Sequence, residues 1–463
     1  MSTGAPATAQ IDRERVRALT ERERTQLDAA TPESKRMFER ARRSMPLGVP
    51  SSYHAREPWP IYIERGQGDV VWDVDGREMF DFHNGFGSML QGHAHPAITR
   101  AVEERLPRGT HFAAPTEDVI AVAEELARRF GLLKWRMVNS GTEATMDAIR
   151  IARAKTGRDT VLKILGSYHG HHDTVMVSIG LSLEDIGDRE APPSTPYGAG
   201  IPSATIDLTA VVPFNDAELL ERRIEQLDAD GRKPACLILE PVLMNIGVVM
   251  PEPGYLEQVR EITRRHGILL IFDEVKTGLV IAAGGATERF GITPDLLTLA
   301  KTLGAGFPSG AVGGTEDAMS VVEDGSVYQV GTFNGNPVVM AAARASLEQV
   351  LTPDAYEHLE RIGDRILAGC QSVVERHDLP AYSVGIGAKG CVTFSPSRIV
   401  DYETFKENQD VELTELAWLY NLNRGIFMTP GREEEWTLSV AHDDEAIDAF
   451  VSVFDELASE LTA

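Results

Sequence analysis

Hydrophobic and polar positions change their spacing repeatedly between residues 116 and 345. Segments with apolar residues at helical spacing alternate with short, almost continuously apolar segments that are typical of buried strands. The predicted helices span 116–130, 142–156, 216–229, 254–266 and 337–351, and the predicted strands span 135–139, 160–165, 235–240, 268–273 and 295–300. This alternation predicts an α/β fold, with a mostly parallel sheet covered by helices on both faces.

The two ends of the chain carry a different pattern. Charged and apolar positions alternate at helical spacing over 11–43, and three short apolar segments between 60 and 82 predict strands. The C-terminal part predicts helices at 356–377, 411–422 and 443–460 and strands at 391–395, 426–428 and 436–440. We therefore expect an N-terminal segment at 1–105 that is part of a small domain, a large α/β domain at 106–345, and a small α+β domain at 346–463.

One long segment, 173–210, has no clear periodicity and is rich in Gly, Pro and Ser. A loop of this length inside a compact domain is usually functional, and often covers a site.

Composition narrows the classes of partner. The 463 residues carry a formal net charge of −25, which argues against nucleic acid because phosphate binding needs a basic surface. No apolar run approaches the length of a membrane span, so we expect no membrane partner. Three cysteines provide no disulfide framework, and a reducing, cytoplasmic location is expected.

Lys301 and Asp273 are the first candidates for chemistry. Each follows a strongly apolar segment, so each is expected at the end of a buried strand. Burial lowers the pKa of a lysine and favours its use as a Schiff-base amine. An aspartate at the end of another buried strand could keep a pyridine nitrogen protonated, so the pair fits pyridoxal phosphate chemistry. A buried structural ion pair is the alternative for these two residues alone.

Polar residues follow two other predicted strands. Ser140, Gly141 and Thr142 open a predicted helix, whose N-terminal N–H groups could bind phosphate. A plain helix cap is the alternative. Tyr168 follows the strand at 160–165 and could stack on a flat cofactor ring, or it could close the edge of the core.

Further candidates are weaker. Glu240 ends a predicted strand and could act on the cofactor or cap local structure, and Thr332 could bind phosphate or belong to a simple turn. The adjacent histidines 169, 171 and 172 lack a second ligand pair at fixed spacing. We therefore expect no metal site.

Together these motifs resemble the class III aminotransferases of fold type I, which use pyridoxal phosphate, and most closely the branch of glutamate-1-semialdehyde 2,1-aminomutase. The similarity runs from about residue 35 to the C-terminus. The stretches that carry it are Gly92–Pro96, Val138–Thr145, Tyr168–His171, Phe272–Val275, Leu299–Lys301, Gly331–Thr332, Gly335–Pro337 and Ala441–His442.

The resemblance implies a role for each matching residue. Lys301 would bind the cofactor covalently and move the substrate proton, and Asp273 would pair with the pyridine nitrogen. Tyr168 would stack on the ring, and Thr332 would reach the phosphate site of a second subunit in a homodimer. The residues implied in cofactor binding are Ser140, Gly141, Thr142, Tyr168, His169, Glu240, Asn245, Asp273, Lys301 and Thr332. The segment 173–210 corresponds to the family's gating loop.

The chain departs from the aminomutase at two places. His54 stands where the aminomutase has an arginine for the substrate carboxylate, and Arg56 could replace it or be a surface charge. After Val275 the aminomutase continues Met-Thr-Gly-Phe-Arg, whereas this chain has Lys276-Thr277-Gly278-Leu279-Val280. Arg432 is a further candidate for carboxylate binding, although a solvent-facing loop residue is the simpler interpretation.

The sequence therefore predicts an aminotransferase that moves an amino group between an amino acid or amine and a keto acid or aldehyde. The donor could be a β-amino acid. The alternatives are the intramolecular aminomutase, another pyridoxal phosphate reaction such as epimerisation or decarboxylation, and a non-catalytic binding protein that retains the fold.

Overall fold

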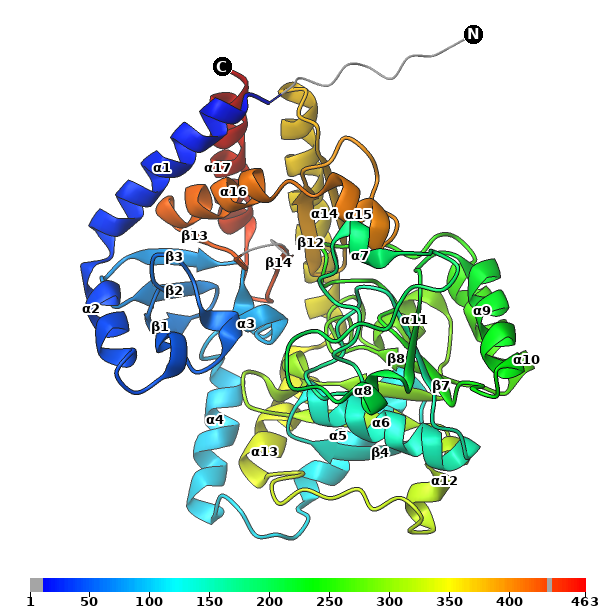
Figure 1. Ribbon diagram of the computed structural model, residues 1–463. Coiled ribbons are helices and arrows are strands. Elements are labelled where there is room, and N and C mark those ends of the chain that lie inside the picture. Colours follow the sequence, from blue (N-terminus) through cyan, green and yellow to red (C-terminus); the bar gives the residue numbers. More distant parts are fainter. Residues whose placement is uncertain (1–10, 431–434) are drawn as a thin grey trace.

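The computed structural model describes residues 11–430 and 435–463, and these form two lobes (Figure 1). The larger lobe is built from the middle of the chain, in cyan and green. The smaller lobe combines the blue N-terminal part with the orange and red C-terminal part. No helix within the described residues is long and apolar enough to cross a membrane.

A seven-stranded sheet forms the centre of the larger lobe, with the strand order β4-β10-β9-β8-β7-β5-β6. The pairs that link β6, β5, β7, β8 and β9 are all parallel. The strands span β4 (Lys134–Val138), β5 (Val161–Ile164), β6 (Thr209–Val212), β7 (Cys236–Leu239), β8 (Leu269–Asp273), β9 (Leu296–Leu299) and β10 (Gly310–Gly314). The α/β fold class with a mostly parallel sheet is confirmed.

Helices cover this sheet, as the sequence pattern predicts. In α5, for example, Val122, Leu126 and Phe130 lie on one face and are fully buried, because residues four positions apart project from the same side of a helix. The helices of the larger lobe are α4 (Pro96–Arg105), α5 (Glu117–Phe130), α6 (Gly141–Thr156), α9 (Ala217–Ala229), α10 (Tyr255–His266), α11 (Gly285–Phe290), α12 (Glu316–Glu323) and α13 (Pro337–Ala345). The predicted helix 337–351 changes to a π-turn over Ser346–Val350.

Strand β10 was not predicted, and it is antiparallel to both of its neighbours. Its sequence, Gly310-Ala311-Val312-Gly313-Gly314, has little strand propensity. Its glycines are explained by packing, because a Cβ on Gly313 would lie 2.6 Å from the Trp135 ring. The strand therefore forms because its neighbours hold it in the sheet.

The segment 173–210 contains more regular structure than the sequence pattern predicts. It includes two short helices, α7 (Leu183–Ile186) and α8 (Ser203–Ile206), and it enters β6 at Thr209. Two buried side chains, Val175 and Val177, anchor its first part. Its role as a gating loop stays a prediction.

Both chain ends contribute to the smaller lobe. Strand β13 (Ile426–Phe427) pairs in parallel with β3 (Glu78–Asp81), which completes a four-stranded sheet with β1 (Ile63–Gln67) and β2 (Val70–Asp73). A second sheet contains β11 (Tyr382–Ile386), β12 (Lys389–Thr393) and β14 (Trp436–Thr437). The predicted strand 436–440 is therefore shorter, and β11 was missed. The domain boundaries themselves stay a prediction.

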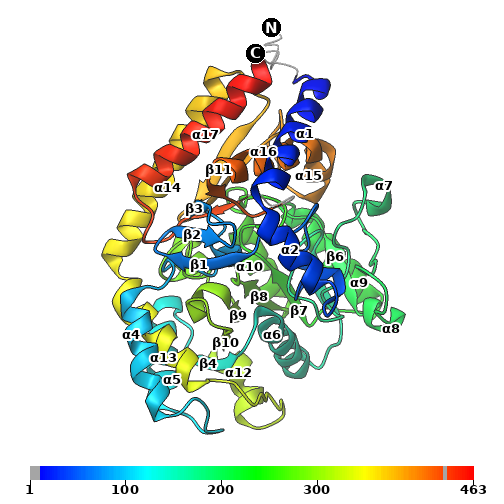
Figure 2. The ribbon, with the colours of Figure 1, turned by 90° about the vertical axis from the view of Figure 1, so that its left-hand side faces the viewer.

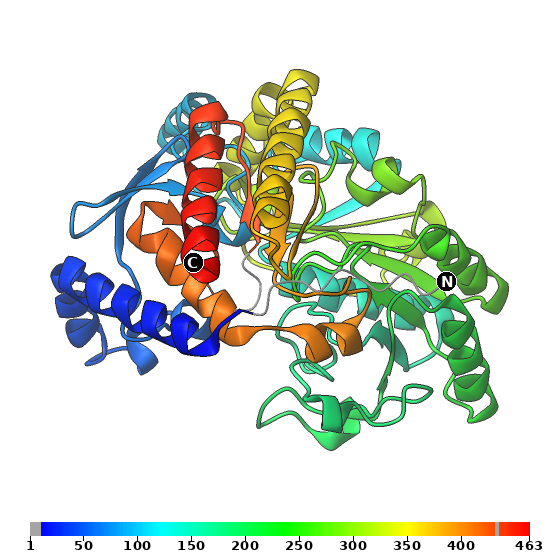
Figure 3. The ribbon, with the colours of Figure 1, turned by 90° about the horizontal axis from the view of Figure 1, so that it is seen from above.

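The helices of this lobe pack around the two sheets. Figure 2 shows α14 and α17 side by side, and Figure 3 shows α1 beside α16. The bounds are α1 (Arg13–Ala30), α2 (Pro32–Ala41), α3 (Asn84–Gly87), α14 (Pro353–Arg376), α15 (Tyr402–Asn408), α16 (Val411–Asn423) and α17 (Asp444–Thr462). The helices predicted at 11–43, 356–377, 411–422 and 443–460 are confirmed.

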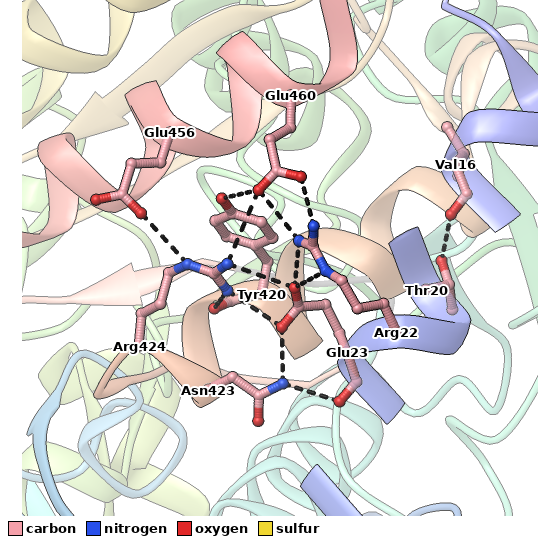
Figure 4. Close-up of polar contacts among 9 residues, drawn as sticks. All are labelled: Val16, Thr20, Arg22, Glu23, Tyr420, Asn423, Arg424, Glu456 and Glu460. Atoms are coloured by element: carbon pink, nitrogen blue, oxygen red, sulfur yellow. Dashed lines mark hydrogen bonds and ion pairs between the residues drawn. The ribbon is translucent and has the colours of Figure 1, made fainter. Parts of the chain in front are cut away.

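A buried carboxylate joins the two ends of the chain (Figure 4). Glu23 of α1 is fully buried and accepts hydrogen bonds from Arg22 at 2.6 Å, Asn423 at 2.8 Å and Arg424 at 3.1 Å. Burial opposes its ionisation, but these donors outweigh that cost and lower the pKa of Glu23. Helix α1 is thus fixed to α16 by charge as well as by packing.

Candidate active site

A cavity of about 360 Å³ lies where several strands of the large sheet end. Its lining residues follow β4, β5, β7, β8 and β9, which is the usual place for a ligand in an open α/β sheet. Among them are Ser140, Gly141, Thr142, Tyr168, His169, Glu240, Asn245, Asp273 and Lys301. We refer to this space as the cofactor cavity. The structure thus brings together nine of the ten predicted cofactor-binding residues.

The N-terminus of α6 opens into this cavity. Ser140 is the cap residue, and its Oγ accepts the backbone N–H of Glu143 at 3.2 Å. Gly141 packs closely, because a Cβ there would lie 2.9 Å from Cγ2 of Val275. A sixteen-residue helix that begins at a glycine offers accessible N–H groups and a positive dipole end. An anionic group such as phosphate fits this position.

Asp273 ends β8 and is held by three hydrogen bonds. Its Oδ2 lies 2.7 Å from Nδ1 of His169, and its Oδ1 accepts from Thr298 Oγ1 and from the backbone N–H of Val275, both at 3.1 Å. The carboxylate side chain is only 4% exposed. These contacts fix the direction of the carboxylate.

His169 is fully buried beside Asp273. Burial lowers the pKa of His169, although the neighbouring carboxylate opposes this shift, so the ring is neutral near pH 7. Because an ionised Asp273 can only accept, Nδ1 carries the proton, and Nε2 lies 2.9 Å from Ser167 Oγ, which can donate to it. The sequence alone gave His169 no specific partner.

Glu240 holds the part of the cavity lining that Tyr168 and Asn245 form. Its Oε1 accepts the backbone N–H of Tyr168 at 3.2 Å, and its Oε2 accepts from Met244 N at 3.1 Å and Asn245 Nδ2 at 2.8 Å. Burial, and then the charge of Asp273, raise the pKa of Glu240 to about 7. Glu240 therefore holds both Tyr168 and Asn245 in place.

Lys301 lies two residues beyond the end of β9, at the start of a 3₁₀ turn (Lys301–Gly304). Its φ is +44°, an unusual value for a lysine. The sequence analysis placed it at the strand end itself. In the structure it belongs to the turn that follows, and it lines the cofactor cavity together with Ala300.

Lys276 was treated only as a departure from a motif, but it also lines the cofactor cavity. Its Nζ lies 2.6 Å from Oε1 of Glu435, and Lys389 Nζ lies 2.9 Å from Oε2 of the same carboxylate. Burial opposes ionisation of Glu435, but the two lysines prevail and lower its pKa. Lys276 also donates to the carbonyl of Met244. A signal was present, since a lysine directly after a buried strand end needs a partner.

A second cavity of about 390 Å³ adjoins the first, and we refer to it as the middle cavity. Tyr168 and Asn245 line both spaces, and Arg56 lines the middle cavity with them. The guanidinium of Arg56 donates to the carbonyl of Pro430 at 2.7 Å. His54 is exposed and stacks on Phe86 at 6.2 Å. Arg432 lies outside the described residues.

Thr332 is exposed and does not line the cofactor cavity among the residues that the structure describes. Asn334, two residues further on, accepts a hydrogen bond from Asn139 at 2.9 Å. This bond links the segment to the residue that precedes the cap of α6, Ser140. The predicted contact of Thr332 with a second subunit stays a prediction.

The donor set of the cofactor cavity fits pyridoxal phosphate. A helix N-terminus for the phosphate, a buried carboxylate for the ring nitrogen, an aromatic side chain and a lysine all line one space. Its volume lies within the range of small-molecule sites. A buried structural ion pair between Lys301 and Asp273 alone would not explain why the cap of α6, Tyr168 and Asn245 line the same cavity.

Comparisons with known proteins agree with this site. Residues 52–414 match the family model of class-III aminotransferases. The chain is 39% identical to glutamate-1-semialdehyde 2,1-aminomutase 2 of Brevibacillus brevis over 420 residues, which cover 90% of this chain and 95% of the relative.

Solved structures give the same result. An omega-transaminase of Sphaerobacter thermophilus superposes with a TM-score of 0.88 at 36% identity, over 93% of this chain and 98% of that one. A glutamate-1-semialdehyde-aminomutase of Pseudomonas aeruginosa in complex with PMP superposes with a TM-score of 0.88 at 30% identity. The match covers 97% of this chain and 99% of that one.

Proposed function

The chain belongs to the class-III aminotransferases, which use pyridoxal 5′-phosphate, and we propose that it moves an amino group from an amino acid or amine to a keto acid or aldehyde. The observation that supports this proposal is that two cavities adjoin. The cavity with Lys301 and Asp273 shares the lining residues Tyr168 and Asn245 with a second cavity that could hold a substrate.

Each residue has a proposed task. When bound, pyridoxal phosphate supplies a ring that withdraws electrons from the substrate carbon next to the nitrogen. Lys301 binds the cofactor through Nζ and moves the proton at that substrate carbon. Asp273 keeps the proton on the ring nitrogen, and the N-terminus of α6 binds the phosphate through Gly141 and Thr142.

Arg56 is the proposed partner of a substrate carboxylate. It lines the middle cavity next to Tyr168, whereas His54 does not line that cavity among the described residues. An arginine presents a planar fork of donors that suits a carboxylate. A donor with its carboxylate some distance from the amine, such as a β-amino acid, would suit a group on the far side of Tyr168.

The intramolecular aminomutase is the second candidate, and the 39% identity to the Brevibacillus brevis relative favours it. Two differences from the aminomutase argue against this candidate. His54 replaces an arginine, and Lys276-Thr277-Gly278-Leu279-Val280 replaces the aminomutase stretch Met-Thr-Gly-Phe-Arg. Losing a bidentate clamp for a carboxylate is not a neutral change.

One experiment separates the two. The purified protein is loaded with pyridoxal phosphate and offered an amine donor together with a keto acid, and separately glutamate semialdehyde. Transfer of the amino group to the keto acid supports the proposal. Isomerisation of the semialdehyde without any transfer would replace it with the aminomutase. A Lys301→Ala variant serves as the control and should lose the cofactor's absorbance near the visible edge.

We also propose a homodimer and a cytoplasmic location. Tyr328 is 81% exposed and Phe333 is 57% exposed, and both flank Thr332. A second copy would cover these apolar side chains and bring Thr332 to its phosphate site. Equilibrium sedimentation tests the dimer. The three cysteines are buried thiols, which supports a reducing compartment.

A further inference from the structure

A third cavity, of about 640 Å³, adjoins the middle cavity on the side away from Lys301. We refer to it as the outer cavity. Arg56, Ile246, Phe405 and Pro430 line both spaces. The outer cavity has no lining residue in common with the cofactor cavity, so the shared residues order the three cavities in a row.

This order assigns each space a different part of the bound molecules. The cofactor cavity, at about 360 Å³, holds the residues that fit the coenzyme. The reacting end of a substrate must lie against Tyr168 and Asn245, which places it at the entrance of the middle cavity. Whatever the substrate carries beyond that point extends toward the outer cavity.

The outer cavity is lined mainly by apolar side chains. Ile399, Phe394, Phe405 and Trp418 are all buried, and the small surface that they retain borders this space. The indole Nε1 of Trp418 donates to Met428 O at 3.3 Å, so the polar atom of that ring is already bonded. A lining of this kind takes up hydrocarbon or aromatic groups.

Two of the three acidic side chains that line the outer cavity have cationic partners. Asp410 lies 2.5 Å from Arg13, and Glu415 pairs with Arg24. Thr414 donates its hydroxyl to the carbonyl of Asp410 at 2.6 Å. The third, Glu57, is exposed, so its charge remains in contact with water, and a neutral tail does not have to desolvate the charges of Asp410 and Glu415 alone.

Arg56 stands between the middle and outer cavities. Its guanidinium is fixed to Pro430 O, and its methylene stem offers apolar surface to a chain that passes it. The side chain is attached to a loop rather than to a regular element.

From this arrangement we infer that the enzyme takes donors with a long alkyl or arylalkyl tail, which lies in the outer cavity while the amine reaches the cofactor. The inference rests on the proposed aminotransferase function and names its substrate class. Burying each methylene in this space favours the complex, so longer donors react faster at low concentration.

Two matched series of donors test this inference. One contains straight-chain primary amines from three to ten carbons, and the other contains 3-amino carboxylic acids with the same range of tail lengths, all kept below their micelle concentrations. The loss of the cofactor's absorbance band gives kcat/KM for the first half-reaction. In at least one series, we expect kcat/KM to rise about threefold to fourfold for each added methylene at the longer lengths.

Two variants fill the outer cavity from different elements. Val392→Phe lies on β12 and Thr414→Phe lies on α16, and both positions line the outer cavity but neither of the other two. In each variant, kcat/KM should no longer rise with donor length. For the short donors, kcat/KM should stay within about twofold of the parent value. Thr414→Ser is the control, because it keeps the hydroxyl without filling space and should retain the full gain with length.

The outcomes are distinct. The inference is overturned if kcat/KM does not change with donor length in the parent enzyme. It is also overturned if the rise of kcat/KM with length persists in both filling variants. In either case, conversion of short donors leaves the aminotransferase proposal standing. If no donor of any length in either series converts the cofactor, the aminotransferase proposal falls, and the inference falls with it. Conversion of short donors by each variant also shows that the variant is folded.

Discussion

Nδ1 of His169 lies 2.7 Å from Oδ2 of Asp273, and both side chains are buried. Asp273 ends β8 and His169 follows β5, so the contact spans the strand between them, β7. The neutral imidazole orients the carboxylate without neutralising it. In the proposed reaction, Asp273 would offer its charge to the protonated ring nitrogen, and His169 would act through Asp273.

Replacing His169 tests this relationship. His169→Phe should retain the cofactor but lower kcat about 10-fold to 100-fold, because a hydrogen bond to a charged group is lost. His169→Asn keeps an N–H donor near the same place and should recover part of the activity. Single-turnover kinetics measure both variants, and equal rates for the two would argue that the ring acts only by filling space.

Asp273 itself should be more sensitive. Asp273→Asn should bind the cofactor yet turn over at least about 100-fold more slowly, since the ring nitrogen loses its charge partner. Thr298→Val removes only one hydrogen bond to Oδ1 and should cost a few-fold. Steady-state rates and cofactor absorbance measure the series, and near-normal turnover of Asp273→Asn would refute the proposed electron-withdrawing role.

Glu240 should make stability depend on pH. Its pKa is about 7 in the folded protein against 4.5 as its ordinary value, so the folded state binds more protons between these limits. Stability of the cofactor-free enzyme should therefore fall by roughly 1 to 3 kcal/mol as pH rises from about 4.5 to 7. Glu240→Gln should show a smaller fall than the parent; a fall remains because burial also raises the pKa of Glu274 to about 7. Urea unfolding across this range measures it, and parallel pH profiles for parent and variant would contradict the prediction.

Gly141 should be required for the phosphate seat. In Gly141→Ala the new Cβ would meet Val275, so the turn must shift, and overpacking of this kind costs about 1 to 3 kcal/mol. We expect cofactor affinity to fall about tenfold or more. Val275→Ala removes the opposing atoms, so the double variant should regain affinity. Fluorescence titration with pyridoxal phosphate measures this, and no recovery in the double variant would show that the clash is not the cause.

Glu23 should matter for stability rather than chemistry. Glu23→Ala removes the acceptor that Arg22, Asn423 and Arg424 share, but both arginines keep ion pairs with Glu460, so we expect a destabilisation of about 1 to 3 kcal/mol. Glu21→Ala, an exposed position on the same helix, should change stability by about 0.5 kcal/mol or less. Denaturant unfolding compares the two.

The lowered pKa of Glu23 adds an acid dependence. Its stabilising effect is present above its ordinary pKa and is lost as pH falls through the lower folded value. The difference in unfolding free energy between the parent and Glu23→Gln should therefore shrink in acid. A difference that stays constant down to pH 3 would mean that the carboxylate charge contributes nothing.

Local pattern in the sequence located the longer helices α5, α6, α9, α10 and α13 and most strands of the larger lobe, but it missed α4, α11, α12 and β6. It also placed Asp273 and the Ser140–Thr142 turn at strand ends, because a buried strand must exchange apolar for polar residues where it leaves the core. It failed for β10, whose glycines carry no strand signal and are explained only by the neighbouring atoms that a Cβ would meet, such as the ring of Trp135 beside Gly313.

The tertiary structure alone decided which polar groups meet. His169 and Asp273 are 104 residues apart, and Lys276 finds Glu435 from the other lobe. The row of cavities past Arg56 likewise depends on side chains from both lobes. Periodicity reports which side of an element is buried, but it contains no information on which distant element will cover that side. The chemistry of this chain could therefore be read from its residues, whereas the shape of its substrate depends on how the two lobes pack.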